Sequence, residues 1–403
     1  MLSGRQVSIL LLVCLLLSLS GCWSRREIET LGFVMAMGID KAQEEGKLQL
    51  TMLVAKPFAL GGGEKSNPQE AAVWIFSSTG DTVFEAIRNG NSQSPRRLFF
   101  AHNRWVLFGE ELAREGIQQA LDFWSRDGES RRTVHVAVAK GTTASQMLQT
   151  RFELERQPSE GARGILNNAA KALSTVVTVR LNEFLQSLES PGVSPVASRA
   201  DIVPRPKDPD VRGEVVEEVI GSSARITGAA VFKRDHLVGW LDQSETRGLN
   251  WVRSEVRSAL LVIEDPGNPG QRIGIEITRA RGQSSVEHVD GRFVARIKVE
   301  AEGHLGDTTA FVEPETDIWE LLEKRMAQAI REDIYAAVSK GQKLQTDFFG
   351  FGSYLYRSNP RLWSQVEDEW QDLIFPTMAV EIDVRSQLRR TGLVIRSDKL
   401  TSR

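Results

Sequence analysis

The chain has 403 residues, of which 41% are hydrophobic and 26% are charged. This composition is typical of ordinary globular proteins and leaves room for two or three domains. The 50 Lys and Arg residues are balanced by 53 Asp and Glu residues, for a net charge of −3. A nucleic-acid-binding protein usually carries a clear basic excess, so no nucleic-acid partner is expected.

The first two dozen residues have the pattern of a bacterial lipoprotein export signal. Arg5 supplies a positive charge, and residues 7–19 form an apolar run that is too short to cross a bilayer. Residues 19–22, Leu-Ser-Gly-Cys, match the lipobox, in which small residues precede a required cysteine. The cysteine thiolate is the nucleophile that takes a diacylglycerol as a thioether. We therefore expect cleavage after Gly21, which leaves Cys22 as the lipidated N-terminus.

A lipid on Cys22 would hold the protein at the outer face of a membrane. The two acyl chains on the sulfur, with or without a third on the amine, each contribute about 0.8 kcal/mol per buried methylene, so the anchor is expected to be permanent. Cys14 lies within the expected signal, so the mature chain has no disulfide. Removal of Arg5 lowers the basic residues from 50 to 49 against 53 acidic ones, a net charge of −4. Beyond Cys22 no apolar stretch is long enough to cross a bilayer, and no cofactor other than the lipid is expected.

Apolar runs and turn signals divide the expected mature chain into three domains with largely antiparallel sheets and packed helices. Residues 22–156 predict a mixed α/β domain, because strand-like runs alternate with short helices. A charged stretch that contains Pro158 sets the first boundary, and residues 157–257 predict a smaller α/β domain. Residues 258–403 predict an α+β domain. The expected signal peptide, residues 1–21, lies outside all three.

Several elements can be predicted in detail. Hairpins are expected at 31–55 and 224–241 and around the Asp290-Gly291 turn, and a single helix is expected at 110–124. A long helix is expected at 317–340, because apolar residues recur at every fourth position along it: Ile318, Leu322, Met326, Ile330, Ile334 and Val338. Its start carries a capping box formed by Asp317 and Glu320, and Gly341 is expected to end it.

Three separated blocks of sequence carry a resemblance to a known family. The first is Cys-Trp-Ser-Arg-Arg-Glu-Ile at 22–28, which runs into Met-Gly-Ile-Asp at 37–40. The second spans 228–251 and contains Glu-Thr-Arg-Gly-Leu-Asn-Trp at its end. The third begins with Asp-Phe-Phe-Gly-Phe-Gly at 347–352 and continues through Tyr356, Asn359, Pro360, Trp363, Trp370 and Arg-Thr-Gly-Leu at 390–393. In this order the blocks resemble the Ger(x)C family of spore-germination lipoproteins, although Ser24 replaces the Asp that is frequent in the family opening.

The Ger(x)C family comprises the C subunits of nutrient germinant receptors. The resemblance implies a lipoprotein on the outer face of the spore inner membrane that acts in nutrient-triggered germination. It implies two integral membrane partners, an A subunit and a transporter-like B subunit, in addition to the membrane lipid. It also implies three mixed α/β domains, which agrees with the boundaries expected from the residues.

Patterns that would indicate catalysis or metal binding do not occur in the sequence. The five histidines, His102, His135, His236, His288 and His304, show no helical metal-binding spacing, and no G-x-S-x-G or G-K-[ST] motif is present. We therefore expect no catalytic residue, no metal and no enzymatic activity. The segment from Gly350 to Gly352 is expected to be a tight turn that places Phe351 in a core, in preference to a ligand loop.

Two charged clusters are candidates for contact with partners. The first follows the lipidated cysteine and would meet anionic headgroups or a membrane subunit: Arg25, Arg26 and Glu27. The second lies beside two tryptophans and is a candidate docking surface or catalytic pair: Asp242, Glu245 and Arg247. Capping and ion pairing at the start of a helix explain the second cluster equally well.

Two classes of function compete at this point. In the first, the protein is a receptor subunit whose surfaces bind membrane partners. In the second, it is an exported lipoprotein that itself captures a small solute. Such lipoproteins usually have two large α/β lobes around a cleft, which the α+β end with its long helix fits less well. An exported, lipid-anchored enzyme ranks third.

Overall fold

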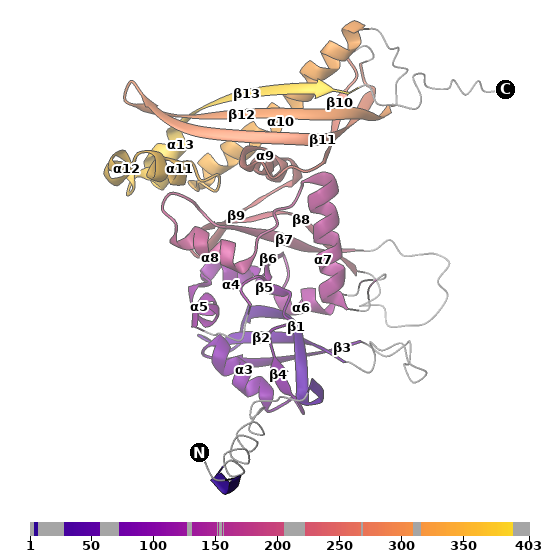
Figure 1. Cartoon of the computed structure of the whole chain (residues 1–403), viewed down its shortest axis with the longest axis vertical. Coiled ribbons are helices and arrows are strands. Elements are labelled where there is room, and N and C mark those ends of the chain that lie inside the picture. Colours follow the sequence, from indigo (N-terminus) through magenta and orange to yellow (C-terminus); the bar gives the residue numbers. More distant parts are fainter. Residues whose placement is uncertain are drawn as a thin grey trace, which may run out of the picture.

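The computed structural model describes residues 4–6, 28–56, 72–126, 131–150, 152, 155, 157–204, 222–266, 269–308 and 316–389. They form the mixed α+β structure that the sequence predicted, built on a nine-stranded and a four-stranded sheet. The first strands and the four-stranded sheet occupy opposite ends of the long axis (Figure 1). The predicted lipobox, the cluster from Arg25 to Glu27 and the block at 390–393 lie outside the described residues.

The nine-stranded sheet has a parallel centre and antiparallel flanks. Its order is β3 (Val73–Gly80), β2 (Leu48–Ala55), β1 (Leu31–Lys41), β5 (Trp105–Gly109), β6 (His135–Lys140), β7 (Val196–Pro204), β8 (Ser222–Lys233) and β9 (His236–Leu241), and β4 (Arg97–Phe99) pairs with β1. The predicted hairpins β1–β2 and β8–β9 are confirmed. The pairs β1–β5, β5–β6 and β6–β7 are parallel. All five residues of β5 are buried, as expected for a parallel strand that is covered on both faces.

Helices cover both faces of this sheet. Trp105 and Leu107 of β5 pack with one group of helices, whereas Val106 and Phe108 point the other way into a second core. The first group consists of α6 (Ala144–Gln149) and α7 (Pro158–Asn168), which continues into the π-helical turn η2 (Ala169–Leu173). The second group consists of α3 (Val83–Asn91), α4 (Glu110–Glu115), α5 (Gln118–Arg126) and α8 (Leu181–Glu189). A short turn, η1 (Ile28–Thr30), precedes β1.

The single helix predicted at 110–124 is wrong, because the structure has two helices there. The chain breaks at Gly116, whose φ is +119°. After the break, the backbone N–H of Ile117 donates to the carbonyl of Asp235 at 3.1 Å, and the N–H of Gln118 donates to the Asp235 carboxylate at 3.2 Å. The β8–β9 turn thus satisfies the first N–H groups of α5, a long-range contact that the local pattern does not encode.

One sheet continues across the domain limit that was expected near residue 157. β6 precedes this limit and β7 follows it, yet the two strands pair directly. The domain limits themselves stay predictions. The strands on both sides share one hydrogen-bonded ladder and therefore form one structural layer.

The second sheet has the order β10 (Ala259–Glu264), β11 (Arg272–Val289), β12 (Arg292–Thr308) and β13 (Ala379–Leu388). The predicted hairpin between β11 and β12 is confirmed, and Asp290 in its turn has a φ of +49°. β13 joins parallel to β12. One face is covered by the long helix α10 (Thr316–Leu344), and the predicted stripe is buried from Leu322 to Val338.

Gly341 does not end α10, so the predicted stop is wrong. The helix continues to Leu344 and ends where Gln345 takes a φ of +52°. A Cβ atom at Gly341 would lie 3.2 Å from the rings of Phe348 and Phe375, so the glycine provides space for aromatic packing. The chain then forms α11 (Phe351–Ser358), α12 (Pro360–Val366), the π-helical turn η3 (Trp370–Ile374) and α13 (Phe375–Thr377).

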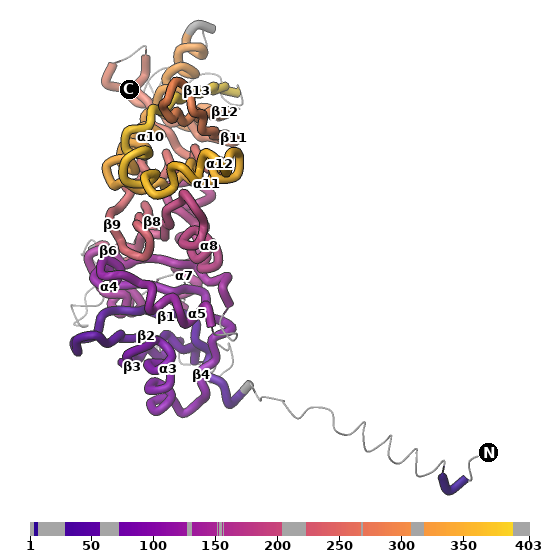
Figure 2. Tube along the Cα trace, turned by 90° about the vertical axis from the view of Figure 1, so that its left-hand side faces the viewer, coloured from indigo at the N-terminus to yellow at the C-terminus, as the bar shows by residue number. Residues whose placement is uncertain are grey.

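The helix α9 (Gln243–Arg253) lies between the two sheets (Figure 1). Figure 2 shows the same order of the sheets from another side, with β8 and β9 below β11, β12 and β13. Leu249, Trp251 and Val252 of α9 belong to the same buried cluster as β8, β11 and α10. A Cβ atom at Gly282 of β11 would lie only 2.2 Å from the carbonyl oxygen of Trp251. The two sheets therefore share one continuous core through α9.

Candidate functional site

The cluster predicted around Asp242 lies at the start of α9 and forms a capping box. The Asp242 carboxylate accepts a hydrogen bond from the Glu245 backbone N–H at 2.8 Å, and the Glu245 carboxylate accepts one from the Asp242 N–H at 2.8 Å. Glu245 also lies 3.5 Å from the Lys340 ammonium group of α10. These contacts agree with the structural reading of the cluster. A partner-binding role for Asp242 and Glu245 stays a prediction.

Arg247 points into the junction between α9 and α10. Its guanidinium group donates Nε to Oδ2 and Nη2 to Oδ1 of Asp333, at 2.6 and 2.9 Å. The Trp251 indole N–H donates to the same carboxylate at 3.3 Å. Burial raises the pKa of Asp333, and the hydrogen bond and charge of Arg247 oppose that rise. The bidentate pair thus compensates a buried carboxylate, which gives Arg247 a structural task.

The third family-like block contains a buried carboxylate that organises its own loop. Asp347 is 0% exposed and accepts hydrogen bonds from the backbone N–H groups of Phe349, Gly350 and Gly352 at 3.1, 2.9 and 2.7 Å. A fourth bond comes from the Trp370 indole N–H at 3.0 Å. Burial raises the pKa of Asp347, and the bonds from Gly352 and Trp370 oppose the rise. Phe351 is buried, so the prediction that it lies in a core is confirmed, but the predicted tight turn is wrong, because Gly350 precedes α11 in the left-handed conformation and Phe351 and Gly352 begin that helix.

The first family-like block also contains a buried carboxylate that accepts backbone hydrogen bonds, that of Asp40. Asp40 accepts hydrogen bonds from the N–H groups of Ala144 and Ser145 at 2.7 and 2.9 Å, and so holds the start of α6 against β1. A Cβ atom at Gly109 would lie 2.1 Å from Asp40 Oδ1, so this close approach requires glycine. Burial raises the pKa of Asp40, and the two backbone N–H groups oppose the rise. The fold is therefore stabilised by the buried contacts of Asp40, Arg247 and Asp347.

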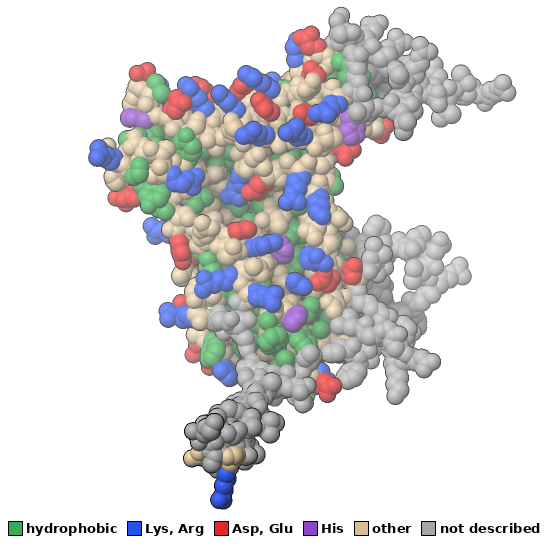
Figure 3. Space-filling model, in the orientation of Figure 1, with side chains coloured by type: hydrophobic (Ala, Val, Ile, Leu, Met, Phe, Trp, Pro, Cys, Tyr) green, Lys and Arg blue, Asp and Glu red, His purple; other side chains and the backbone are tan. Residues whose placement is uncertain are grey.

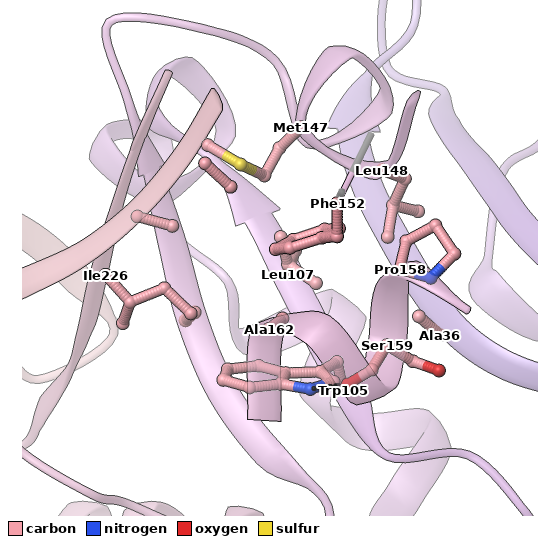
Figure 4. Close-up of a pocket in the computed structure, with 13 residues that line it drawn as sticks. Ala36, Trp105, Leu107, Met147, Leu148, Phe152, Pro158, Ser159, Ala162 and Ile226 are labelled. Carbon is pink, nitrogen blue, oxygen red and sulfur yellow. Dashed lines mark hydrogen bonds between the residues drawn. The ribbon is translucent and has the colours of Figure 1, made fainter. Parts of the chain in front are cut away.

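A small apolar cavity lies between the first sheet and the helices α6 and α7 (Figure 4). Trp105, Met147, Phe152 and Ala162 surround it, and its volume is about 30 Å³. That space corresponds to about two water molecules and does not accommodate a sugar or an amino acid. The Trp105 indole N–H donates to the Ser159 carbonyl at 3.1 Å on its wall. The cavity is a packing defect rather than a ligand site.

A much larger polar cleft opens beside α7, η2 and the start of α8. It has a volume of about 980 Å³, and its lining contains two acidic side chains, Glu183 and Glu255, against six basic ones: Arg104, Arg131, Arg163, Lys171, Arg180 and Arg257. We call it the basic cleft. In the region of α7 and α8, Figure 3 shows several Lys and Arg side chains with a histidine among them over the middle of the molecule.

The floor of the basic cleft is polar and partly buried. Asn250 of α9 donates its Nδ2 to the carbonyls of Ser174 and Val176 at 2.8 and 3.1 Å, which leaves the buried Oδ1 without a partner among the described residues. Asn103 accepts a bond from the Trp105 N–H at 3.2 Å, while its buried Nδ2 has none. His135 completes the floor. The cleft thus offers both donor and acceptor groups.

The surroundings of His135 in the cleft lower its pKa. Burial, and to a smaller extent the positive charges of Arg180, Arg163 and Arg104, together lower its pKa to about 4. The imidazole is therefore uncharged at neutral pH, and the positive charge of the cleft resides on Lys and Arg. Sequence reasoning missed this cleft, because its cations come from separate segments of the chain and form no local motif.

The described part of the chain contains neither a metal-binding cluster nor a membrane-spanning helix. No three His, Cys, Asp or Glu side chains there are grouped closely enough to hold a metal ion. None of the helices there combines the length and the apolar character needed to span a membrane.

Two family models match the chain, and both describe spore germination proteins. The model "Spore germination protein N-terminal domain" matches residues 24–202, and "Spore germination B3/ GerAC like, C-terminal" matches residues 227–392. Together they cover most of the sequence, including the second block and all of the first and third blocks except residues 22, 23 and 393. The chain belongs to the Ger(x)C family of spore germination proteins, as the resemblance predicted.

Individual relatives agree over nearly their whole lengths. Spore germination protein KC of Bacillus subtilis (strain 168) is 27% identical, with 95% of this chain and 96% of the relative covered. Spore germination protein B3 of the same organism is 24% identical, with 94% and 96% covered. The solved structure "Crystal Structure of the GerBC protein" superposes with a TM-score of 0.56 at 20% identity, and covers 90% of this chain and 99% of that one. That structure therefore shows the same fold.

Proposed function

We propose that the chain is the lipid-anchored C subunit of a nutrient germinant receptor. In this role it lies on the outer face of the spore inner membrane and works with integral membrane A and B subunits. The observation that carries the proposal is alignment with spore germination proteins over more than nine-tenths of both chains. The lipobox at 19–22 directly precedes the family opening and supports the anchor.

The proposal includes a binding role without catalysis. Arg247, which was a candidate for a catalytic pair, is engaged by Asp333 in a bidentate pair. The carboxylates of Asp40 and Asp347 are likewise occupied by backbone N–H groups. Reactive groups need access to a substrate. These buried groups are better suited to holding a scaffold that presents surfaces to partners.

Germination of spores that lack this chain tests the proposal. Release of dipicolinic acid is measured against a panel of amino acids and sugars, with the wild-type chain as complementation. Loss of the response to one nutrient class, restored by complementation, is the expected result. A normal response to every nutrient, in spores that also lack the paralogous receptors, would contradict the receptor role and favour a solute-binding lipoprotein.

The anchor has a separate test. Cys22→Ala removes the only acceptor for the diacylglycerol, so the chain is expected to leave the membrane fraction. Ser24→Ala, two residues further on, is the matched control and is expected to stay with the membrane. The circular dichroism of the released chain is expected to match that of the wild type, because residue 22 precedes the first described strand. Unchanged membrane association of the Cys22→Ala chain would refute the lipid anchor.

A further inference from the structure

The basic cleft differs from the other charged groups of the molecule because much of its charge has no acidic partner. Arg104 and Arg163 share the carboxylate of Glu160, at 3.7 and 2.6 Å. Among the described residues, Lys171, Arg180 and Arg257 form no ion pair within 4.0 Å. Like charges that converge on one hollow repel each other and raise the local positive potential. Such a concentration, in a chain with a net charge of −3, needs an explanation other than the fold.

The volume and the position of the cleft are typical of a small-molecule site. A volume of about 980 Å³ lies at the upper end of the range for small-molecule sites, and such sites often lie where structural units meet. Here the wall combines α7 and η2 with Arg257, which leads from α9 into β10 of the second sheet. The π-helical turn η2 carries Lys171, and π-turns occur frequently at functional sites.

The floor adds two buried polar atoms that have no hydrogen-bond partner among the described residues, Asn250 Oδ1 and Asn103 Nδ2. Asn250 is 3% exposed and Asn103 is 5% exposed, and each leaves one buried amide atom without a partner among the described residues. Leaving a buried polar atom unpaired usually costs stability, so such atoms commonly serve a bound molecule or water. The two amides offer one acceptor and one donor in the same cleft as the cations.

We propose that the basic cleft binds a small organic anion that carries carboxylate or phosphate groups. Guanidinium groups pair with both kinds of group in bidentate geometry, and an ammonium group adds a point charge. Arg180, Arg257 and Lys171 supply the charge, and Asn250 and Asn103 lie beneath. The proposal concerns the chain by itself and stands whether or not the chain acts in a receptor.

An acidic segment of a partner protein is the competing occupant. A segment of this kind would be expected to lie along an open basic surface, whereas here the cations come from several segments and converge on one floor. The hollow form and the one unpaired atom on each of the two amides therefore favour a small molecule. The experiment separates the two occupants, because only a small molecule binds to the purified chain without partners.

The test uses the full mature chain, with its lipid anchor held in micelles of a neutral detergent. Inorganic phosphate, citrate and chloride are titrated by calorimetry at pH 7.5 and low ionic strength. We expect phosphate or citrate to bind with a dissociation constant below about 1 mM, and chloride to act only as a weak competitor. Tighter binding of citrate would identify a carboxylate ligand, and tighter binding of phosphate would identify a phosphate ligand.

Matched variants assign the binding to the cleft. The double variant Arg180→Gln and Arg257→Gln is expected to weaken binding by at least about tenfold, because it removes two charge-assisted donors. Lys171→Gln, a single change on an exposed turn, is expected to weaken it by about threefold. Arg385→Gln removes the same charge on β13, outside the cleft, and is expected to change the affinity less than twofold. Melting temperatures show that each variant is folded.

Two results would overturn the proposal. The first is that titration of phosphate and citrate up to about 10 mM gives no heat of binding. If the double variant nevertheless impairs assembly with membrane partners, the occupant of the cleft is an acidic protein segment. The second is equal weakening by Arg385→Gln and by the double variant. That result would indicate general attraction by surface charge, without a defined site.

Discussion

The helix α9 contributes to two regions of opposite electrostatic character. On the side of α10, Arg247 and Trp251 hold the carboxylate of Asp333, and nearby Asp347 is enclosed by four N–H donors. On the other side, Asn250 lies on the floor of the basic cleft, where Lys171, Arg180 and Arg257 are among the cations that have no acidic partner among the described residues. We call the first region the α9 junction.

The difference between the two regions indicates that the family-like sequence blocks stabilise the fold. The α9 junction contains parts of two of the three blocks, and its carboxylates, Asp333 and Asp347, are buried and accept hydrogen bonds within the chain. Removing one of its members should therefore cost stability. The cations of the basic cleft are exposed and contribute few contacts to the fold, so changing them should affect binding but not stability.

The largest effect is expected at the centre of the α9 junction. Asp347→Ala leaves four N–H donors without an acceptor, and the free energy of unfolding is expected to fall by about 4 kcal/mol. Chemical denaturation measures this change. Asp347→Asn keeps one carbonyl acceptor and is the matched control, with a smaller expected loss. A loss below about 1 kcal/mol for Asp347→Ala would show that the loop does not depend on the carboxylate.

The ion pair between α9 and α10 should be the next most sensitive point. Arg247→Ala leaves the buried Asp333 carboxylate without its main partner, so the expected loss is about 3 kcal/mol in denaturant unfolding. The double change Arg247→Met and Asp333→Leu removes both charges and is expected to recover part of that loss. If the double variant is less stable than Arg247→Ala, the pair does not compensate a desolvated charge.

On the side of the basic cleft, His135 is expected to make the stability of the protein sensitive to acid. The pKa of His135 in the folded chain is about 4, below the usual value of 6.5, so the unfolded state binds the proton more readily. The stability from neutral His135 is present above pH 6.5 and is lost as the pH falls toward 4. The expected loss is about 1 to 2 kcal/mol, after allowance for partial exposure of the ring.

Replacement of His135 tests its contribution to the loss of stability in acid. His135→Gln cannot take up the proton, so its stability is expected to vary less between pH 6.5 and pH 4 than that of the wild type. His288→Gln, on the second sheet, is the control and should retain the wild-type slope. Parallel pH profiles for wild type and His135→Gln would mean that the cleft does not lower the pKa of the ring.

The smallest effect is expected for the exposed cations. Arg257→Gln should change the free energy of unfolding by less than about 0.5 kcal/mol, since no ion pair is lost and repulsion within the cleft is reduced. Thermal melting at low ionic strength measures the change. A loss comparable to that of Arg247→Ala would remove the distinction between the two regions.

Local periodicity predicted much of the secondary structure. The stripe from Leu322 to Val338 is buried along α10, and the hairpins at β1–β2, β8–β9 and β11–β12 form as expected. The capping box of Asp242 was also predictable, because its partner is three residues away. These features depend on neighbours in sequence or on a repeated pattern, and both are visible without a fold.

The candidate sites were less predictable. Asp242, Glu245 and Arg247 were recognised as a charged cluster, but the sequence did not reveal that Arg247 pairs with Asp333, 86 residues away. The basic cleft was missed altogether, because its cations come from segments between Arg104 and Arg257. Spacing along the chain carries no information about which of many basic residues will converge.

The sequence by itself determined the family, the alternation of strands and helices, and the pattern that predicts an exported lipoprotein. Each of these is encoded in short motifs or in the period of apolar residues. Only the tertiary structure decided that one sheet continues past residue 157, that Gly341 lies within a helix beside Phe348 and Phe375, and that cations surround Asn250. These outcomes depend on contacts between distant segments, whose energies arise only when the chain is packed.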